Sequence, residues 1–200
     1  MRIIRCSHQP PNIFHYLHHV KACIIFLGIL FLVACSDIQK PEYLEKIKQL
    51  GSEVEAITEI SENIDVDSIH LLINQIENVE SRIKKNYQDD TLNLLLVEKL
   101  DAYKRIHPNL SIVSKLCELM EGAIDLRVSS LEGLKNDIEN SAGKRSEYGE
   151  YIEQEKTEIG ELKRSVNYCD SVTKTSFKTF NTLHPEIEKF SFELELKNKE

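Results

Sequence analysis

The 200-residue sequence contains no tryptophan, seven glycines and five prolines. Glycine and proline interrupt regular secondary structure, so their scarcity, together with abundant Leu, Ile, Glu and Lys, predicts an all-α fold. The sequence also lacks the short motifs of common catalytic sites, with no His-Glu-x-x-His, no Gly-x-Ser-x-Gly and no glycine-rich phosphate loop. We therefore predict that the protein is not an enzyme and that it has no cofactor and no metal site.

Basic residues are fewer than acidic ones, 25 against 33, and the formal net charge at pH 7 is −8. Residues 1–34 contain three basic residues and no acidic residue, which leaves 22 basic and 33 acidic residues, a net charge of −11, for the remaining 166. Such a surface repels nucleic acid and anionic lipid, so we expect neither a nucleic-acid partner nor a polybasic membrane contact. A chain of this length suits one domain with a core of its own.

One apolar run, Ala22–Ala34, is 13 residues long and follows Lys21. A helix needs about 20 apolar residues to span a bilayer, so we expect a cleaved signal here rather than an uncleaved membrane anchor, which is the alternative. The run ends in Leu32-Val33-Ala34, and Cys35 follows directly. This ending resembles the signal of bacterial membrane lipoproteins, in which a peptidase cuts before a cysteine that already carries a diacylglyceryl thioether.

The resemblance implies cleavage between Ala34 and Cys35, lipidation of Cys35 and attachment to a membrane of the cell envelope through N-terminal acyl chains. Several acyl chains, each contributing about 0.8 kcal/mol per buried methylene, hold a protein on a membrane essentially permanently. The expected organisation is a signal peptide (1–34), an acylated tether (35–40) and a single helical domain (41–200). By the same resemblance to envelope lipoproteins, Ser36 rather than Asp after the cysteine favours the outer membrane. Its periplasmic face and the cell surface both remain open as locations.

From Pro41 onward, apolar residues recur at spacings of three and four, which predicts a bundle of five or six helices. We expect Asp65-Val66-Asp67 to separate the first two helices, with Asp67 as the N-cap of the second. Residues 88–90 are expected to form the next turn. The third helix is apolar nearly all round between Leu92 and Leu100, and is therefore predicted to be the most buried element.

Two His-Pro pairs are expected to end helices. His107-Pro108 follows the third helix and His184-Pro185 follows the last long one, with the histidines capping free carbonyl groups. With His70, these are the only histidines of the expected helical domain. The tail, residues 186–200, alternates apolar and polar residues as a strand does, but it also fits a helical stripe. We favour a helix, because a lone strand has no partner in an otherwise helical chain.

The remaining two helices are predicted to form an antiparallel coiled-coil hairpin over residues 111–183, with its turn at Gly143. Each helix carries a seam of seven residues spaced by three and four: Cys117, Met120, Ile124, Arg127, Leu131, Leu134 and Ile138 on the first, and Tyr148, Ile152, Glu155, Ile159, Leu162, Val166 and Cys169 on the second. Folding the chain back at Gly143 brings Arg127 next to Glu155, and Cys117 level with Cys169. We therefore predict a salt bridge for the first pair. For the second we predict a disulfide, with two packed free thiols as the alternative.

A membrane anchor and a long hairpin without a catalytic cluster predict a non-catalytic, lipid-anchored cell-envelope protein. We expect it to act as a protein-interaction or scaffold module that binds a protein partner through helix faces or the hairpin tip. One alternative is a helical carrier of a lipid or other apolar small molecule. Another is a minor enzyme subunit or an immunity-type inhibitor.

Overall fold

The computed structural model describes residues 39–87 and 94–198. Its elements in chain order are α2 (Lys40–Glu62), α3 (Val66–Asn86), α4 (Leu94–Lys104), α5 (Ile106–Asn140), a 3₁₀ turn η1 (Arg145–Glu147) and α6 (Tyr148–Lys197). No strand occurs in these two ranges, so the all-α prediction is confirmed. The tail is helical as far as Lys197, as we favoured.

The contacts divide the chain into two units, Met1–Pro41 and Glu42–Glu200. The predicted signal peptide (1–34), its cleavage site at Ala34 and Cys35, and the lipidation of Cys35 all lie outside the described residues. Among the helices that are described, none is both long enough and apolar enough to cross a membrane.

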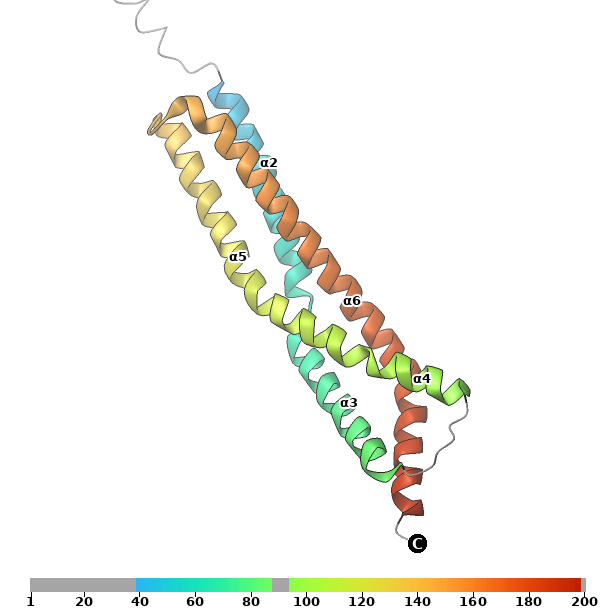
Figure 1. The fold of residues 1–200 in the computed structure, drawn as a ribbon. Helices are drawn as coiled ribbons and strands as arrows, with labels where there is room; N and C mark the ends of the chain where they lie inside the picture. Colours follow the sequence, from blue (N-terminus) through green and yellow to red (C-terminus); the bar gives the residue numbers. More distant parts are fainter. Residues whose placement is uncertain (1–38, 88–93, 199–200) are drawn as a thin grey trace, which may run out of the picture. The chain divides into compact units, whose positions relative to one another are not determined.

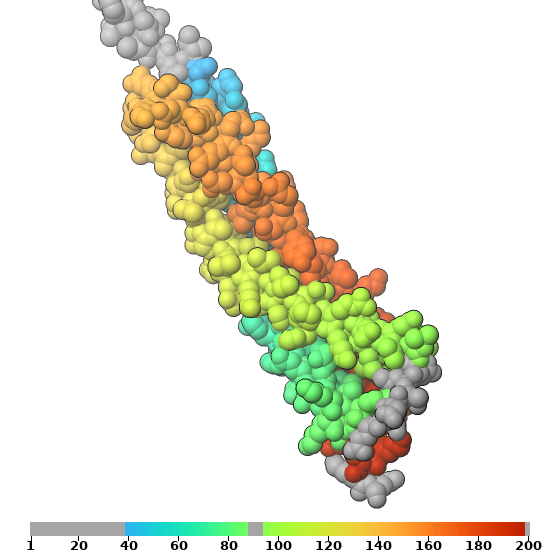
Figure 2. Space-filling view, in the orientation of Figure 1, coloured from blue at the N-terminus to red at the C-terminus, as the bar shows by residue number. Residues whose placement is uncertain are grey.

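Three helical stretches pack together in the second unit: α2 with α3, α4 with α5, and α6 (Figure 1). Helices α5 and α6 form an antiparallel hairpin, α3 packs against both of them, and α4 contacts α3, α5 and α6. Figure 2 shows α5 and α6 side by side on one face of this unit. The amphipathic stripe of each helix faces the others and forms one continuous core.

The predicted seam is the core of the hairpin. Every seam residue except Cys117 and Arg127 is buried. The turn differs in detail, because α5 ends in the left-handed residue Ser141 (φ 53°), and Gly143 (φ 70°) is a second left-handed position rather than the cap itself. The Tyr148 hydroxyl contacts the carbonyl oxygens of Asp137 (3.0 Å) and Ala142, which ties the start of α6 to the end of α5.

Two predicted helix boundaries were wrong by a few residues. The N-cap of α3 is Asp65 rather than Asp67, because the Asp65 carboxylate accepts a hydrogen bond from the Ser68 amide at 2.9 Å. Helix α4 ends at Lys104 and α5 begins at Ile106, so Pro108 lies in the first turn of a helix instead of after one. Proline is tolerated there, because a first-turn amide has no helical acceptor.

The predicted end of a helix at His184-Pro185 was also wrong, since α6 continues through Pro185. An interior proline costs about 3 kcal/mol. Contacts on the far side of it offset this cost: Glu186 pairs with Lys99 of α4 at 2.7 Å, and Ile187 is fully buried.

Helix α4 is not the most buried element. Leu94 and Leu95 are 73% and 59% exposed, and only Leu100 and Tyr103 of this helix are buried. Neighbouring helices cover only one side of α4, so the apolar residues on its other side stay exposed although the helix is apolar nearly all round.

Candidate functional site

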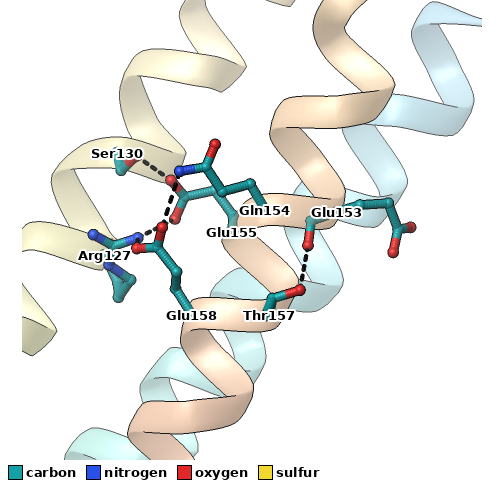
Figure 3. Close-up of polar contacts among 7 residues, drawn as sticks. All are labelled: Arg127, Ser130, Glu153, Gln154, Glu155, Thr157 and Glu158. Atoms are coloured by element: carbon teal, nitrogen blue, oxygen red, sulfur yellow. Dashed lines mark hydrogen bonds and ion pairs between the residues drawn. The ribbon is translucent and has the colours of Figure 1, made fainter.

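The hairpin contains one buried polar cluster, shown in Figure 3. Arg127 of α5 forms the ion pair that the seam predicts, with its Nη1 3.0 Å from Glu155 Oε2, and both side chains are only 11% exposed. Two further residues complete the cluster: Arg127 also pairs with Glu158, and Ser130 donates a hydrogen bond to the other Glu155 oxygen. Sequence analysis missed both, although Glu158 lies one helical turn from Glu155. This cluster has a structural role, since it satisfies a buried charge and fixes the register of the hairpin.

The predicted disulfide is absent. Cys117 and Cys169 are free thiols, although they lie close enough for each to influence the pKa of the other. At the usual 8–10 Å between packed helix axes, side chains at such positions touch without reaching disulfide geometry. Burial raises the pKa of the Cys117 thiol, and raises that of Cys169 to about 11. Both groups are therefore protonated and poorly nucleophilic near pH 7.

The prediction that His107 and His184 cap helix ends at their prolines was wrong, and the structure does not bring the three histidines of its described residues together. His70 Nε2 lies 3.2 Å from Ser114 Oγ, and His107 Nε2 lies 3.1 Å from the Glu77 carboxylate. His184 stacks on Phe180, and its Nδ1 lies 2.7 Å from the Tyr103 hydroxyl. Burial lowers the pKa of His184. In residues 39–87 and 94–198, no group of three or more His, Cys, Asp or Glu side chains could hold a metal ion.

A second apolar seam of α5 is exposed at the surface. Ile112, Leu119 and Leu126 follow each other at seven-residue spacing and are 50%, 70% and 58% exposed. Leu116 and Ala123 lie between them at spacings of three and four and are partly buried. Residues at these spacings share one helix face, so the five residues form a continuous apolar strip, here named the α5 face. The pattern is legible in the sequence, but we missed it because the neighbouring core seam has the same period.

Acidic residues accompany the α5 face. Glu118, Asp125 and Glu132 repeat at the same seven-residue spacing, and Glu118 and Asp125 directly precede its exposed leucines. Together with Glu121 they are exposed, and within the described ranges none of the four is in an ion pair. The α5 face therefore combines apolar side chains with a row of negative charge that the bundle itself does not neutralise.

Comparison of the chain with known proteins found no matching family model, no matching curated protein and no matching solved structure.

Proposed function

We propose that the protein is a non-catalytic, lipid-anchored cell-envelope protein that binds a helix of another protein on its α5 face. The observation that carries this proposal is the exposure of Ile112, Leu119 and Leu126 along one line of α5. Helix α5 already buries a complete seam against its neighbours, so a second apolar strip is not needed for folding. Contiguous exposed apolar surface of this kind is typical of a docking site.

The charge of the α5 face specifies the partner. A helix that packs on a heptad strip places its own apolar residues against it and its flanking residues against the charges alongside. The unpaired row Glu118, Asp125 and Glu132 therefore fits an amphipathic helix flanked by Lys and Arg. A second copy of this chain would bring like charges together, and an anionic membrane surface would be repelled.

The fold favours α5 over the hairpin tip as the binding surface. The Tyr43 ring, near the start of α2, packs edge-on against Tyr148 at the base of the tip, with centroids 6.2 Å apart. The hairpin tip therefore lies at the same end of the bundle as Tyr43 of α2 and already packs against it. The α5 face ends at Leu126, roughly 21 Å along the helix from Asn140 at 1.5 Å per residue.

In-cell photocrosslinking with the full-length chain tests this proposal. A photoreactive amino acid replaces Leu119 in one variant and Leu71 of α3, which is similarly exposed at 63%, in the control. We expect the Leu119 variant alone to crosslink a protein, through a helix that carries Lys and Arg beside an apolar stripe. Identical adducts at both positions, or adducts at Leu119 only to lipid or to a second copy of the chain, would overturn it.

A further inference from the structure

A cleft of about 410 Å³ lies between α3, α4 and α6, and none of the described residues that line it belongs to α5. Most of these residues are apolar or aromatic, among them Ile83 of α3, Leu100 and Tyr103 of α4, and Phe190 of α6. The volume is at the lower end of the range of about 300–1,000 Å³ for small-molecule sites. The cleft therefore suits one short apolar chain, and it is separate from the α5 face.

Two lysines from different helices line the same cleft. Lys84 belongs to α3 and Lys104 is the last residue of α4, and both are exposed. Exposed lysine side chains keep their ammonium groups in water, which places these groups at the mouth of the cleft. Within residues 39–87 and 94–198, neither lysine forms an ion pair.

The cleft is therefore more basic than the protein as a whole. Glu80, one helical turn before Lys84, is the only acidic residue among the described residues of the lining, and it does not pair with Lys84. The two lysines leave the lining with one positive charge in excess, on a chain whose formal net charge is −8.

This combination of groups selects a class of ligand. An apolar chain is stabilised when it leaves water for contact with Leu100 and Phe190. An anionic head at the mouth is attracted to the ammonium groups of Lys84 and Lys104, whereas a cationic head is repelled. Because the head and the lysines both stay in contact with water, no charged group has to be desolvated inside the cleft.

We infer that this cleft binds a free, single-chain amphiphile with a carboxylate head. Its apolar chain packs against Leu100 and Phe190, and its carboxylate stays at the mouth of the cleft near Lys84 and Lys104. The carrier function considered from the sequence thereby acquires a defined site and a ligand class. The inference does not depend on the protein-binding function proposed for α5.

Matched probes test the charge of the head. Octanoate, 1-octanol and octyltrimethylammonium have similar apolar chains, with a negative, an uncharged and a positive head. In NMR titrations of the full-length protein, we expect octanoate to bind about fivefold more tightly than octanol, and octyltrimethylammonium to bind most weakly. The largest shifts should occur at Leu100 and Phe190. Equal affinities, absence of octanoate binding, or shifts confined to another part of the chain would overturn the inference.

A soluble two-chain lipid separates a free amphiphile from a membrane lipid. Dihexanoyl-phosphatidylglycerol has an anionic head and two short chains, and the volume of the cleft suits one chain, so we expect it to bind more weakly than octanoate. Tighter binding than that of octanoate would overturn the inference and would assign the cleft to a membrane phospholipid.

Variants locate the head group. Lys84→Gln and Lys104→Gln each remove one charge from an exposed side chain, so we expect the double variant to stay folded and to bind octanoate and octanol about equally. Lys85→Gln is the matched control, because Lys85 is exposed and adjacent to Lys84 but does not line the cleft. We expect it to retain the preference for octanoate. A preference that survives in the double variant, or that Lys85→Gln removes equally, would contradict the assignment.

Discussion

Arg127 and Glu155 form a buried ion pair of 3.0 Å across the hairpin. Removing one charge from such a pair leaves the other buried and uncompensated, at a cost of about 3–5 kcal/mol, whereas replacing both can be nearly neutral. Two partners on different helices must be level to meet, so the pair also selects one register of α5 against α6.

We therefore expect Arg127→Met to lower the free energy of unfolding by about 3–5 kcal/mol, and the double variant Arg127→Met/Glu155→Met to recover most of the loss. Urea denaturation followed by circular dichroism measures both. The control is Lys163→Met, which breaks the exposed Lys163–Glu53 pair and should cost less than about 1 kcal/mol. If Arg127→Met costs no more than the control, the pair does not stabilise the hairpin.

His184 should make stability depend on pH. Burial lowers its pKa, so between its folded and unfolded values the unfolded chain binds more protons. The contribution of His184 to the free energy of unfolding is therefore fully present above about pH 6.5, the pKa of the unfolded chain. It is lost as the pH falls from there through the lower pKa of the folded state. We expect denaturation midpoints measured across this range to fall less steeply in His184→Gln than in the wild type. Parallel curves would show that His184 does not contribute.

The two seam thiols should be unreactive in the folded protein. Burial raises the pKa of Cys169 to about 11 and also raises that of Cys117, so few thiolates are available at pH 7. We expect iodoacetamide to modify both residues slowly in native protein and rapidly in urea, as peptide mass spectrometry would show. A linked pair of Cys117 and Cys169 peptides that separates into two peptides on reduction would contradict the structure.

Pro185 should be destabilising where it stands. It removes one helical hydrogen bond from the interior of α6. We therefore expect Pro185→Ala to raise the free energy of unfolding by up to about 3 kcal/mol. Pro108→Ala is the control, because Pro108 occupies the first turn of α5 and its replacement restores no helical hydrogen bond. A loss of stability in Pro185→Ala would mean that the contacts beyond it require the proline geometry.

The α5 face should matter for binding and not for folding. Leu119→Glu and Leu71→Glu both replace exposed side chains, so each should change stability by less than about 0.5 kcal/mol. We expect Leu119→Glu alone to weaken partner binding, by at least about tenfold, because it places a charge inside the apolar strip. Affinity for the crosslinked partner helix, measured with both variants, checks this. Equal effects of the two substitutions would contradict the assignment.

The hairpin illustrates how much was predictable. The spacing of Met120 to Ile138 and of Tyr148 to Val166 follows from the helical period alone, and antiparallel folding at the turn makes the two seams level. The polar pair Arg127 and Glu155 could be assigned for the same reason. Glu158 and Ser130 were missed because neither lies at a seam position. Their contacts with Arg127 and Glu155 depend on how far the side chains extend, which the spacing of apolar residues does not indicate.

The sequence by itself determined the helices and the seam of the hairpin, because these depend on the spacing of residues a few positions apart. It also determined the pairing of the layers, because a single short turn between two helices of regular period fixes which residues become level. The tertiary structure decided the continuation of α6 through Pro185, the exposure of Leu94 and Leu95, and the contact of His184 with Tyr103. It also decided that the thiols of Cys117 and Cys169 remain unbonded and that one face of α5 remains uncovered. Burial, helix spacing and the partners of polar groups depend on residues far apart in the chain, which a local pattern does not specify.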